Sequence, residues 1–509
     1  MQRRGEAMAP VEGDLIGADL IGTEVRMTES SEPAAEPPRA RERELARNDV
    51  ADAAMAETGT IPRAGLAATL RRAAVVVGIL VWFGVRRVWA ALTGWLPGGA
   101  SLSGPVALRL AFERLGPIYI KLGQLIASGE ALFPAAYSEE FRRLLDRVPA
   151  FSRADVEHIV ERDLGKPVRE LFASFDDVPM AAASIAQVHG ATLPDGREVV
   201  VKVQRPGLAA LASADLRILR FFAWLVMKVS PLARGSNVGA FVDDFEANLR
   251  QELDFRHEAE AMREFNEVMH VFGNDRTRAP VVEDALTHAR VLTMERFRGW
   301  RIDDIEGVRG SGYEPVETLL HGIRSWFQTL ILRGFFHGDV HAGNFMLLSD
   351  GRIGYLDFGI VGRFGEDHQK GVLEYVLGFQ QRDFGRVADA MILMKTAADA
   401  ERVDRDALAH DLEAIYAPLL RAPTGEATAG EVAAGADDAF QIKDLVPGMI
   451  RTGRTHGLRM PRELVLVTKQ LVYLDRYSRA YGGDDMNVLT DTRLTNTIVQ
   501  DSFVAMMSA

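Results

Sequence analysis

The period of the apolar positions changes several times along this chain and divides it into segments. Residues 1–60 have no apolar period and contain several prolines, which predicts a disordered tail. Helical spacing runs through 101–170, strand-like runs occur in 171–298, and mainly helical spacing fills 299–509. The order predicts an α+β protein in which a helical extension precedes a smaller part with strands and a larger helical part.

Strand-like runs at 185–188 and 199–203 flank Pro194-Asp195-Gly196. Asp-Gly between two such runs is a strong signal of a β-hairpin. A long helical stretch follows at about 212–270, and 289–294 is strand-like again. Segment 171–298 is therefore expected to form a small lobe of strands with a helical insert.

A helical pattern over 315–334 precedes two short strand-like runs at 345–348 and 353–356. The turn Ser349-Asp350-Gly351 separates these runs, and the remainder is helical. One low-complexity run, 424–438, is expected to be an exposed loop. The whole order predicts a two-lobed protein-kinase-like fold with extra N-terminal and C-terminal helices.

The strongest apolar run covers 73–85, and pairs of arginines bracket it at 71–72 and 86–87. A membrane span needs about 20 apolar residues, so this run by itself is too short to cross a bilayer. A core helix fits the pattern, and so does an interfacial helix whose arginine pairs lie at lipid headgroups and whose Trp82, Trp89 and Trp95 lie near the membrane boundary. Segment 61–100 is therefore predicted to be an apolar or interfacial helix.

Composition narrows the class of protein. The chain has 509 residues, of which 47% are hydrophobic and 26% charged, so a large core can form. The net charge of −12 argues against a protein that coats nucleic acid. The chain has no cysteine, which excludes disulfides, thiolate metal sites and cysteine nucleophiles.

The strongest chemical signal is the segment His337-Gly338-Asp339-Val340-His341-Ala342-Gly343-Asn344, followed by Asp357-Phe358-Gly359. Kinases place a catalytic carboxylate and a metal-binding Asn in one Asp-x-x-x-x-Asn loop, and a second metal ligand in Asp-Phe-Gly. Asp339 and Asn344 have that spacing. The sequence predicts Asp339 as the catalytic carboxylate, and Asn344 and Asp357 as Mg²⁺ ligands.

The second signal is Lys202, which lies in Val-Val-Val-Lys at the end of a predicted strand. Kinases use a Lys in this place to hold nucleotide phosphates, and they pair it with a Glu on a helix. The predicted helix near 241 offers several acidic residues for this pair: Glu252, Asp254, Glu258 and Glu260.

The nucleotide loop differs from that of protein kinases. Before Lys202 there is no Gly-x-Gly-x-x-Gly, and Ala181, Ala182, Ala183 and Ser184 stand in its place. Each Ala methyl limits how closely the backbone approaches a phosphate, so the nucleotide geometry is expected to be altered. Glu295, at the end of the strand-like run 289–294, is the candidate hinge residue beside the adenine.

These motifs resemble the UbiB family of atypical kinases, also called AarF-domain or coenzyme-Q-associated kinase-like proteins. The resemblance covers about 105–480. Lys121 and Gln124 match its Lys-x-Gly-Gln motif, 181–184 its Ala-rich loop, and Glu252 and Asp254 its Glu-x-Asp motif. The resemblance also implies that Glu258 is the partner of Lys202.

The resemblance implies an atypical kinase-like ATPase or phosphotransferase that uses ATP and Mg²⁺. It implies a role in, or regulation of, quinone or isoprenoid-lipid metabolism. The expected location is the cytoplasmic face of a membrane, peripheral or interfacially anchored, with a lipid or quinone-related small molecule as a partner. Lys121 and Gln124 are expected to restrain the enzyme. In that scheme Lys121 pairs with Glu252 and Asp254, which are expected to lie on the helix that carries Glu258.

Three alternatives are weighed against this interpretation. The first is a pseudokinase scaffold for lipid-biosynthetic enzymes. The second is a small-molecule phosphotransferase of the aminoglycoside or choline type, which shares His-Gly-Asp-x-His but lacks the Lys-x-Gly-Gln motif. The third is a metallohydrolase that uses His337 and His341, but it leaves Asn344 and Asp357 without a role.

Overall fold

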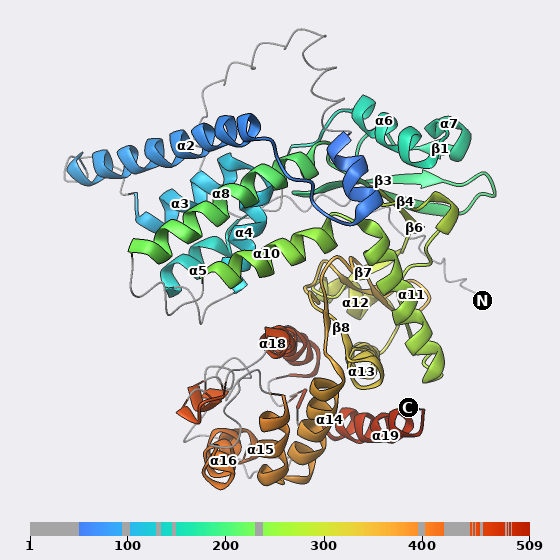
Figure 1. Ribbon diagram of the computed structural model, residues 1–509. Helices are drawn as coiled ribbons and strands as arrows, with labels where there is room; N and C mark the ends of the chain where they lie inside the picture. The colour runs from blue at the N-terminus through green and yellow to red at the C-terminus, as the bar shows by residue number, and fades with distance from the viewer. Residues whose placement is uncertain are drawn as a thin grey trace. The chain divides into compact units, whose positions relative to one another are not determined.

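The structure is a computed structural model (Figure 1), and the residues that it describes are 50–93, 102–128, 134–144, 149–229, 238–394, 403–421, 448–449, 451–453, 455–458, 462–483, 486, 488–489 and 491–508. The chain divides into two compact units. The first comprises 1–191 and 202–247, and the second comprises 192–201 and 248–509.

Helices form much of the first unit. α2 packs against α3 and α8, and α3 packs against α4 and α5 (Figure 1). Local signals set their ends: the Ser103 side chain accepts a hydrogen bond from the Val106 N–H at the start of α3, and Gly116 ends it with φ +95°. The helices up to the boundary are α2 (Leu66–Thr93), α3 (Gly104–Leu115), α4 (Pro117–Ser128), α5 (Ala135–Phe141), α6 (Arg153–Leu164), α7 (Val168–Leu171), α8 (Leu208–Val229) and α10 (Val238–Glu252), which crosses it.

The strands β1 (Ser174–Phe175), β2 (Ala181–Ala182), β3 (Ala186–Thr192) and β4 (Glu198–Gln204) follow, with β3 and β4 forming the hairpin that Asp195-Gly196 predicts. Gly196 has φ +90°, which explains why a glycine is placed in this turn. The sheet order is β1-β3-β4-β6, with β2 on β3 and with β6 at Val291–Glu295. β4 contributes residues to both units.

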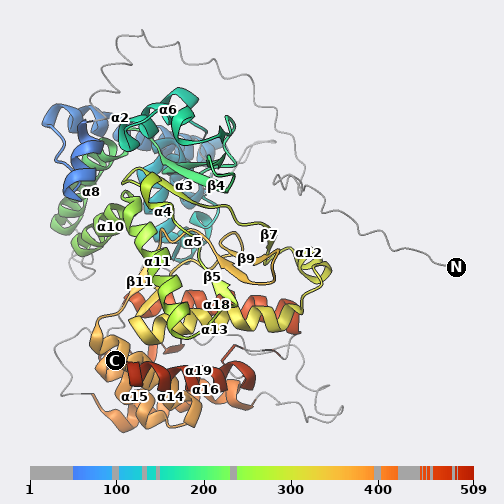
Figure 2. The ribbon, with the colours of Figure 1, turned by 90° about the vertical axis from the view of Figure 1, so that its right-hand side faces the viewer.

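In the second unit, a four-stranded sheet of order β5-β10-β9-β7 lies against α13 (Figure 2). β9 and β10 are antiparallel, and Tyr355 is opposite Phe345. A separate pair, β8 with β11, follows α13. The strands are β5 (Thr277–Arg278), β7 (Gly299–Arg301), β8 (Phe335–His337), β9 (Phe345–Leu348), β10 (Ile353–Tyr355) and β11 (Val361–Arg363).

The core of the second unit centres on α13, whose apolar face buries Leu319, Ile323, Trp326 and Leu330. This is the face that the helical pattern over 315–334 predicts. The remaining helices of the second unit are α11 (Phe255–Val271), the 3₁₀ turn η1 (Asp284–Leu286), α12 (Ile305–Gly310), α13 (Pro315–Arg333), α14 (Glu366–Gln381), α15 (Phe384–Leu393), α16 (Arg405–Arg421), α18 (Arg462–Gly482) and α19 (Thr492–Ser508).

The boundary of the predicted disordered tail needs correction. Residues 50–58 are helical, and the Asp52 carboxylate accepts hydrogen bonds from the Gly207 and Ala209 N–H groups at the start of α8. A carboxylate in this place satisfies N–H groups that the helix itself leaves unpaired. Residues 50–58 therefore belong to the folded unit. The rest of the predicted tail, like the predicted loop at 424–438, lies outside the described residues.

The predicted helical stretch at about 212–270 contains α8, α10 and α11. α10 ends at Glu252 and α11 begins at Phe255. The Asp254 side chain caps α11 by accepting from the Arg256 N–H, and the Phe255 N–H donates to Ala289 O. Glu252 and Asp254 therefore do not lie on the helix that carries Glu258, contrary to the expectation for the Lys-x-Gly-Gln scheme.

The apolar segment forms a longer helix than its apolar run predicts. Leu66–Leu92 is long and apolar enough to cross a membrane by length and composition alone. With 28 residues, α2 is about 42 Å long, so the argument from run length was wrong. The core-helix alternative also fails, because only Val76, Phe83 and Thr69 among the described side chains of α2 are buried.

Arg72 has a different role from the expected contact with lipid headgroups. Its guanidinium bonds both carboxylate oxygens of Asp215 on α8, at 2.7 and 2.9 Å, and also donates to Leu115 O. Asp215 is fully buried, and that burial raises its pKa while Arg72 opposes the rise. Arg72 therefore holds α2 on the first unit.

Gly123 of the Lys-x-Gly-Gln motif has a packing role. A Cβ at this position would lie 2.7 Å from the Phe141 ring and 2.2 Å from Leu144 Cδ1. Glycine thus allows α4 to approach α5 closely.

Candidate active site

The predicted catalytic loop connects β8 to β9. β8 pairs with β11 so that His337 is opposite Val361, and the Gly338 N–H donates to Ile360 O. At the end of the loop, the Leu356 N–H donates to Asn344 O at 2.9 Å. These backbone bonds bring the Asp339 loop and the Asp-Phe-Gly segment side by side.

The Asp339 carboxylate is partly accessible, with a side-chain exposure of 25%. His341 Nε2 lies 3.7 Å from its Oδ2, and Lys469 Nζ on α18 lies 3.6 Å from its Oδ1. The carboxylate is thus flanked by two basic side chains and is still open to a reactant.

Asn344 is buried at the end of the loop. Its Nδ2 donates to Asp339 O at 3.1 Å, and its N–H donates to His341 O at 2.8 Å. The first bond orients the side-chain amide, so its oxygen is the atom that would face a cation.

Asp357 follows β10 in a left-handed conformation with φ +50°, which is uncommon for a residue with a side chain. Its Oδ1 accepts from the Gly359 N–H. The side chain of Phe358 is buried against Phe265 of α11 and against His337, with ring centroids 5.4 and 4.8 Å apart. The buried Phe358 thus fixes the exposed Asp357 beside the loop.

His337 connects the two motifs from inside the core. Its Nδ1 accepts from the Asp339 N–H at 3.2 Å, and its Nε2–H donates to Leu356 O at 2.8 Å. The Trp326 Nε1–H donates to His337 O. Burial lowers the pKa of His337, so the ring is neutral and its two nitrogens have different roles.

Gln470 on α18 holds the loop from the other side. Its Nε2 donates to Gly338 O at 2.6 Å, and its Oε1 accepts from the Val340 N–H at 2.9 Å. The sequence reasoning missed both Gln470 and Lys469. Neither residue belongs to a recognisable motif, because a Lys-Gln pair in a helix is ordinarily exposed to solvent. Only the burial of Gln470 in the structure shows that this pair is different.

The donor set fits a magnesium ion. A carboxylate from Asp357 and an amide oxygen from Asn344 are the hard oxygen ligands that Mg²⁺ prefers. Within the described ranges there is no group of three His, Cys, Asp or Glu residues that would hold a metal ion. Two protein ligands leave the remaining positions to phosphate oxygens and water, as Mg²⁺ usually requires.

The Ala-rich loop is a short hairpin in the first unit. β2 pairs with β3 so that Ala181 is opposite Val188, and the Ala183 N–H donates to Ala186 O. Ser184 at its tip is buried, and its Oγ has no hydrogen-bond partner among the described residues. Lys202 lies on β4 and is largely buried.

Of the acidic residues weighed as partners of Lys202, only Glu258 is a buried residue of α11, and Glu260 is exposed. Lys202 and Glu258 belong to different units, and their ion pair stays a prediction. Asp254 pairs with Arg256 in addition to capping α11. The proposed pairing of Lys121 with Glu252 and Asp254 also joins different units and stays a prediction.

Glu295 ends β6, and its side chain has structural contacts. Its carboxylate pairs with Arg278 and accepts from the Val281 N–H. Its own N–H donates to Val281 O at 2.8 Å. If Glu295 contacts an adenine, its main-chain carbonyl is therefore the group available to do so.

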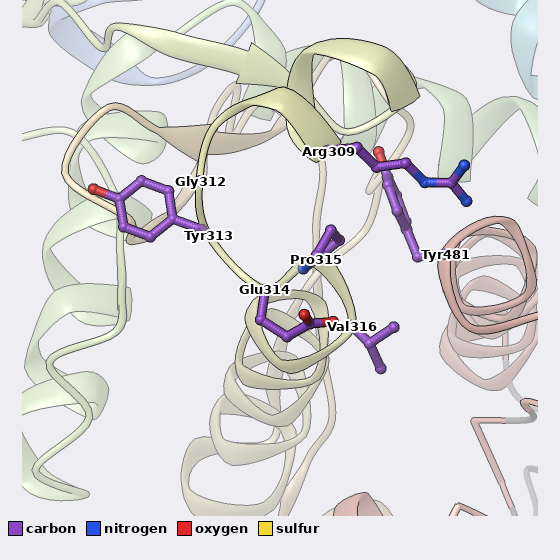
Figure 3. A pocket seen from close by; sticks show the side chains of 7 residues that line it. All are labelled: Arg309, Gly312, Tyr313, Glu314, Pro315, Val316 and Tyr481. Atoms are coloured by element: carbon purple, nitrogen blue, oxygen red, sulfur yellow. The ribbon is translucent and has the colours of Figure 1, made fainter. Parts of the chain in front are cut away.

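A cavity in the second unit lies away from these residues. Its volume is about 530 Å³. The ring of Tyr313 points away from Tyr481 (Figure 3), and each hydroxyl donates to a main-chain oxygen, of Ser349 and of Ile302 respectively. It is lined by Arg309, Gly312, Tyr313, Glu314, Pro315, Val316 and Tyr481, and none of the predicted site residues lines it.

Comparison with known proteins assigns the family. Residues 143–391 match the model of the ABC1 atypical kinase-like domain. An uncharacterised chloroplastic aarF domain-containing protein kinase of Arabidopsis thaliana is 34% identical over 442 residues, which are 83% of this chain and 81% of that protein. An uncharacterised protein of Mycobacterium tuberculosis is 38% identical over 388 residues, 75% of this chain and 76% of that protein.

A probable protein kinase UbiB of Marinobacter nauticus is 31% identical over 380 residues, which cover 73% of this chain and 66% of that protein. The match to the family model begins before β1 and ends within α15. It therefore includes both Lys202 and the predicted catalytic and metal-binding residues Asp339, Asn344 and Asp357. This chain belongs to the ABC1 atypical kinase-like family, together with the aarF-domain and UbiB proteins, and has the α+β protein-kinase-like fold of that family.

Proposed function

We propose that this protein binds Mg-ATP and acts as an atypical kinase-like ATPase or phosphotransferase, in or as a regulator of quinone or isoprenoid-lipid metabolism at a membrane. One observation carries the proposal. Backbone bonds hold the Asp339–Asn344 loop against the segment that ends in Asp357, so a carboxylate base and two oxygen ligands lie together. Phosphoryl transfer requires this set and little further covalent help from the protein.

In this function Asp339 orients the attacking hydroxyl or water and accepts its proton. Asn344 and Asp357 hold Mg²⁺, which neutralises charge on the phosphates when it is bound. Lys202 contacts phosphate oxygens and Glu258 positions Lys202. The Ala-rich hairpin, with Ser184 at its tip, covers the phosphates.

The first prediction tests turnover with the purified protein. Wild-type protein is expected to hydrolyse Mg-ATP, faster with anionic liposomes than without them, and Asp339→Asn is expected to lower kcat by about 100-fold or more because the proton acceptor is lost. Release of inorganic phosphate measures this. Wild-type protein that binds Mg-ATP but gives no turnover above that of Asp339→Asn would favour the pseudokinase scaffold instead.

The membrane part of the proposal is supported by exposed apolar side chains on two helices of the first unit. The C-terminal halves of α2 and α8, two helices that pack against each other (Figure 1), carry most of them. In these two halves the exposed apolar residues are Val81, Trp82, Val85, Val88, Trp89 and Leu92 on α2, and Phe221, Trp224, Leu225, Val226 and Val229 on α8. We call these residues the α2–α8 apolar face.

Cations accompany the aromatic residues of this face. Arg86 lies over the Trp82 ring at 4.8 Å, and Lys228 lies over the Trp224 ring at 5.6 Å. Tryptophan beside Lys or Arg is typical of side chains at a lipid headgroup boundary, where the cation adds about 1 kcal/mol of attraction to anionic lipid.

The Arg72–Asp215 pair favours a helix that lies on the membrane over one that crosses it. If α2 left the first unit to span a bilayer, Asp215 would remain buried without its partner, and breaking such a pair costs about 3–5 kcal/mol. The α2–α8 apolar face can meet lipid while this pair stays intact.

The second prediction concerns flotation with anionic liposomes. Trp89→Glu on α2 and Trp224→Glu on α8 are each expected to weaken flotation, and so is high salt, because the face loses apolar contact or electrostatic attraction. Phe503→Glu on α19 is the matched control, since Phe503 is also an exposed aromatic residue, at 57%. Equal loss in all three variants would contradict the assignment of this face to the membrane.

A further inference from the structure

A cation from outside the catalytic loop faces the Asp339 carboxylate. Lys469 Nζ lies 3.6 Å from Asp339 Oδ1, whereas His341 lies near the other carboxylate oxygen, Oδ2. At this distance the contact is an ion pair and not a hydrogen bond. Lys469 lies on α18, well beyond the residues 143–391 that match the family model. The C-terminal part of the chain thus adds a positive charge to the site.

The neighbouring contacts fix the backbone of Lys469 and leave its ammonium free to turn. Gln470, the next residue, is bonded to Gly338 O and to the Val340 N–H, on both sides of Asp339. The Lys469 side chain is 34% exposed, and its Nζ lies 5.8 Å from the centre of the Tyr473 ring. The ammonium can therefore move from Asp339 to a nearby ligand while its helix stays bonded to the loop.

The position suits the transferred phosphoryl group. The carboxylate that orients the attacking oxygen must lie beside the γ-phosphorus, and in the transition state negative charge spreads over the γ-phosphoryl oxygens. An ammonium next to that carboxylate lies beside this charge and has three N–H groups to donate.

We propose that Lys469 is a catalytic residue that turns from Asp339 to a γ-phosphoryl oxygen when ATP binds, an inference that rests on the function proposed above. The oxygen of water or of an acceptor hydroxyl forms a bond to the γ-phosphorus. The bond from this phosphorus to the β–γ bridging oxygen breaks, and ADP leaves with its electron pair. The proton of the attacking group goes to the Asp339 carboxylate, and Lys469 stays protonated and donates a hydrogen bond throughout.

Binding of two nucleotides separates this role from a structural one. Lys469→Ala is expected to weaken binding of β,γ-methylene-ATP by about tenfold, because a charge-assisted hydrogen bond is lost. Binding of ADP, which has no γ-phosphate, should stay within about twofold of the wild type, a free-energy change below that of one hydrogen bond. Calorimetry with Mg²⁺ present measures both affinities.

Turnover gives a second readout. Lys469→Ala is expected to lower kcat for ATP hydrolysis by about 100-fold, as removal of one donor to a developing anion does in other enzymes. Lys469→Arg keeps the charge and should recover part of this loss. Arg476→Ala is the matched control, because Arg476 is an exposed cation on the same helix and should leave kcat unchanged.

The outcomes separate this inference from the proposed function. Wild-type protein that binds neither nucleotide contradicts the proposed function itself. If the wild type binds both nucleotides, two results overturn the inference. The first is an unchanged kcat in Lys469→Ala. The second is that Lys469→Ala weakens the binding of ADP and of the ATP analogue equally, or weakens the binding of neither. Selective loss of the ATP analogue with a lowered kcat supports it.

Discussion

Asp357→Asn is expected to abolish Mg²⁺-dependent ATP binding and to lower turnover by about 1,000-fold or more, since the Mg²⁺ that would neutralise the phosphate charge loses its carboxylate ligand. The substitution keeps the shape of the side chain and removes its negative charge. Only neutral amide oxygens would then remain as protein ligands at the predicted metal site, and these hold Mg²⁺ poorly. Titration of ATP binding against Mg²⁺ concentration is the direct measurement.

Asp367→Asn serves as the control for this experiment, because Asp367 is an exposed carboxylate in the first turn of α14. It should bind Mg-ATP as the wild type does. The left-handed backbone at Asp357 tolerates Asn as well as Asp, so the variant should fold. Unchanged Mg²⁺-dependent binding and hydrolysis in Asp357→Asn would remove this residue from the metal site.

His337→Ala is expected to cost about 3–5 kcal/mol of stability, the range for loss of a large buried side chain. The His337 ring is fully buried and packs against the rings of Tyr355 and Phe358. Its loss would also leave Leu356 O and the Asp339 N–H without their partners. Thermal or denaturant unfolding measures the change, and a variant as stable as the wild type would contradict this account of the core.

The same substitution has a predicted pH dependence. Burial lowers the pKa of His337 below its ordinary value of 6.5, so below about pH 6.5 the unfolded chain binds a proton that the folded protein does not. The stability that neutral His337 contributes is present above that pH and is lost as the pH falls. Burial also lowers the pKa values of His189 and His321. The wild type and His337→Ala should therefore both lose stability in acid.

The difference between wild type and His337→Ala isolates this residue. It should be larger at about pH 8 than at about pH 5, because only the wild type loses the contribution of His337 on acidification. Asp339, Asp357 and His341 also act on the His337 charge, the two carboxylates raising its pKa and His341 lowering it, but burial dominates. A difference that is independent of pH would contradict a neutral buried ring.

The predicted catalytic residues illustrate what one sequence can yield. Asp339, Asn344 and Asp357 lie within a short stretch that contains one hairpin, so their spacing nearly fixes their geometry. The Asp-Gly turn between β3 and β4 was confirmed for the same reason, since two adjacent strands and a turn residue are local features. Glu258 could be named only through a resemblance, because several acidic residues nearby fit the same pattern.

Other predictions failed where the local sequence was compatible with two different structures. The chain around Glu252 and Asp254 is compatible with one long helix, but the bond from the Phe255 N–H to Ala289 O favours a break with Asp254 as the cap. The arginines around the apolar run were assigned to lipid headgroups, yet Arg72 bonds Asp215, which is more than a hundred residues away. Sequence alone offers no reason to choose that partner.

By itself, then, the sequence determined the kinase-like order of elements and the family, and it predicted the catalytic loop and the two metal ligands. Each of these is encoded by residues close together in the chain, where backbone preferences and spacing suffice. The tertiary structure alone decided that α18 brings Lys469 and Gln470 to the Asp339 loop and that Arg72 holds α2 against α8. These contacts join residues more than a hundred positions apart. They depend on how whole helices pack, and the local pattern of apolar and polar residues carries no information about that packing.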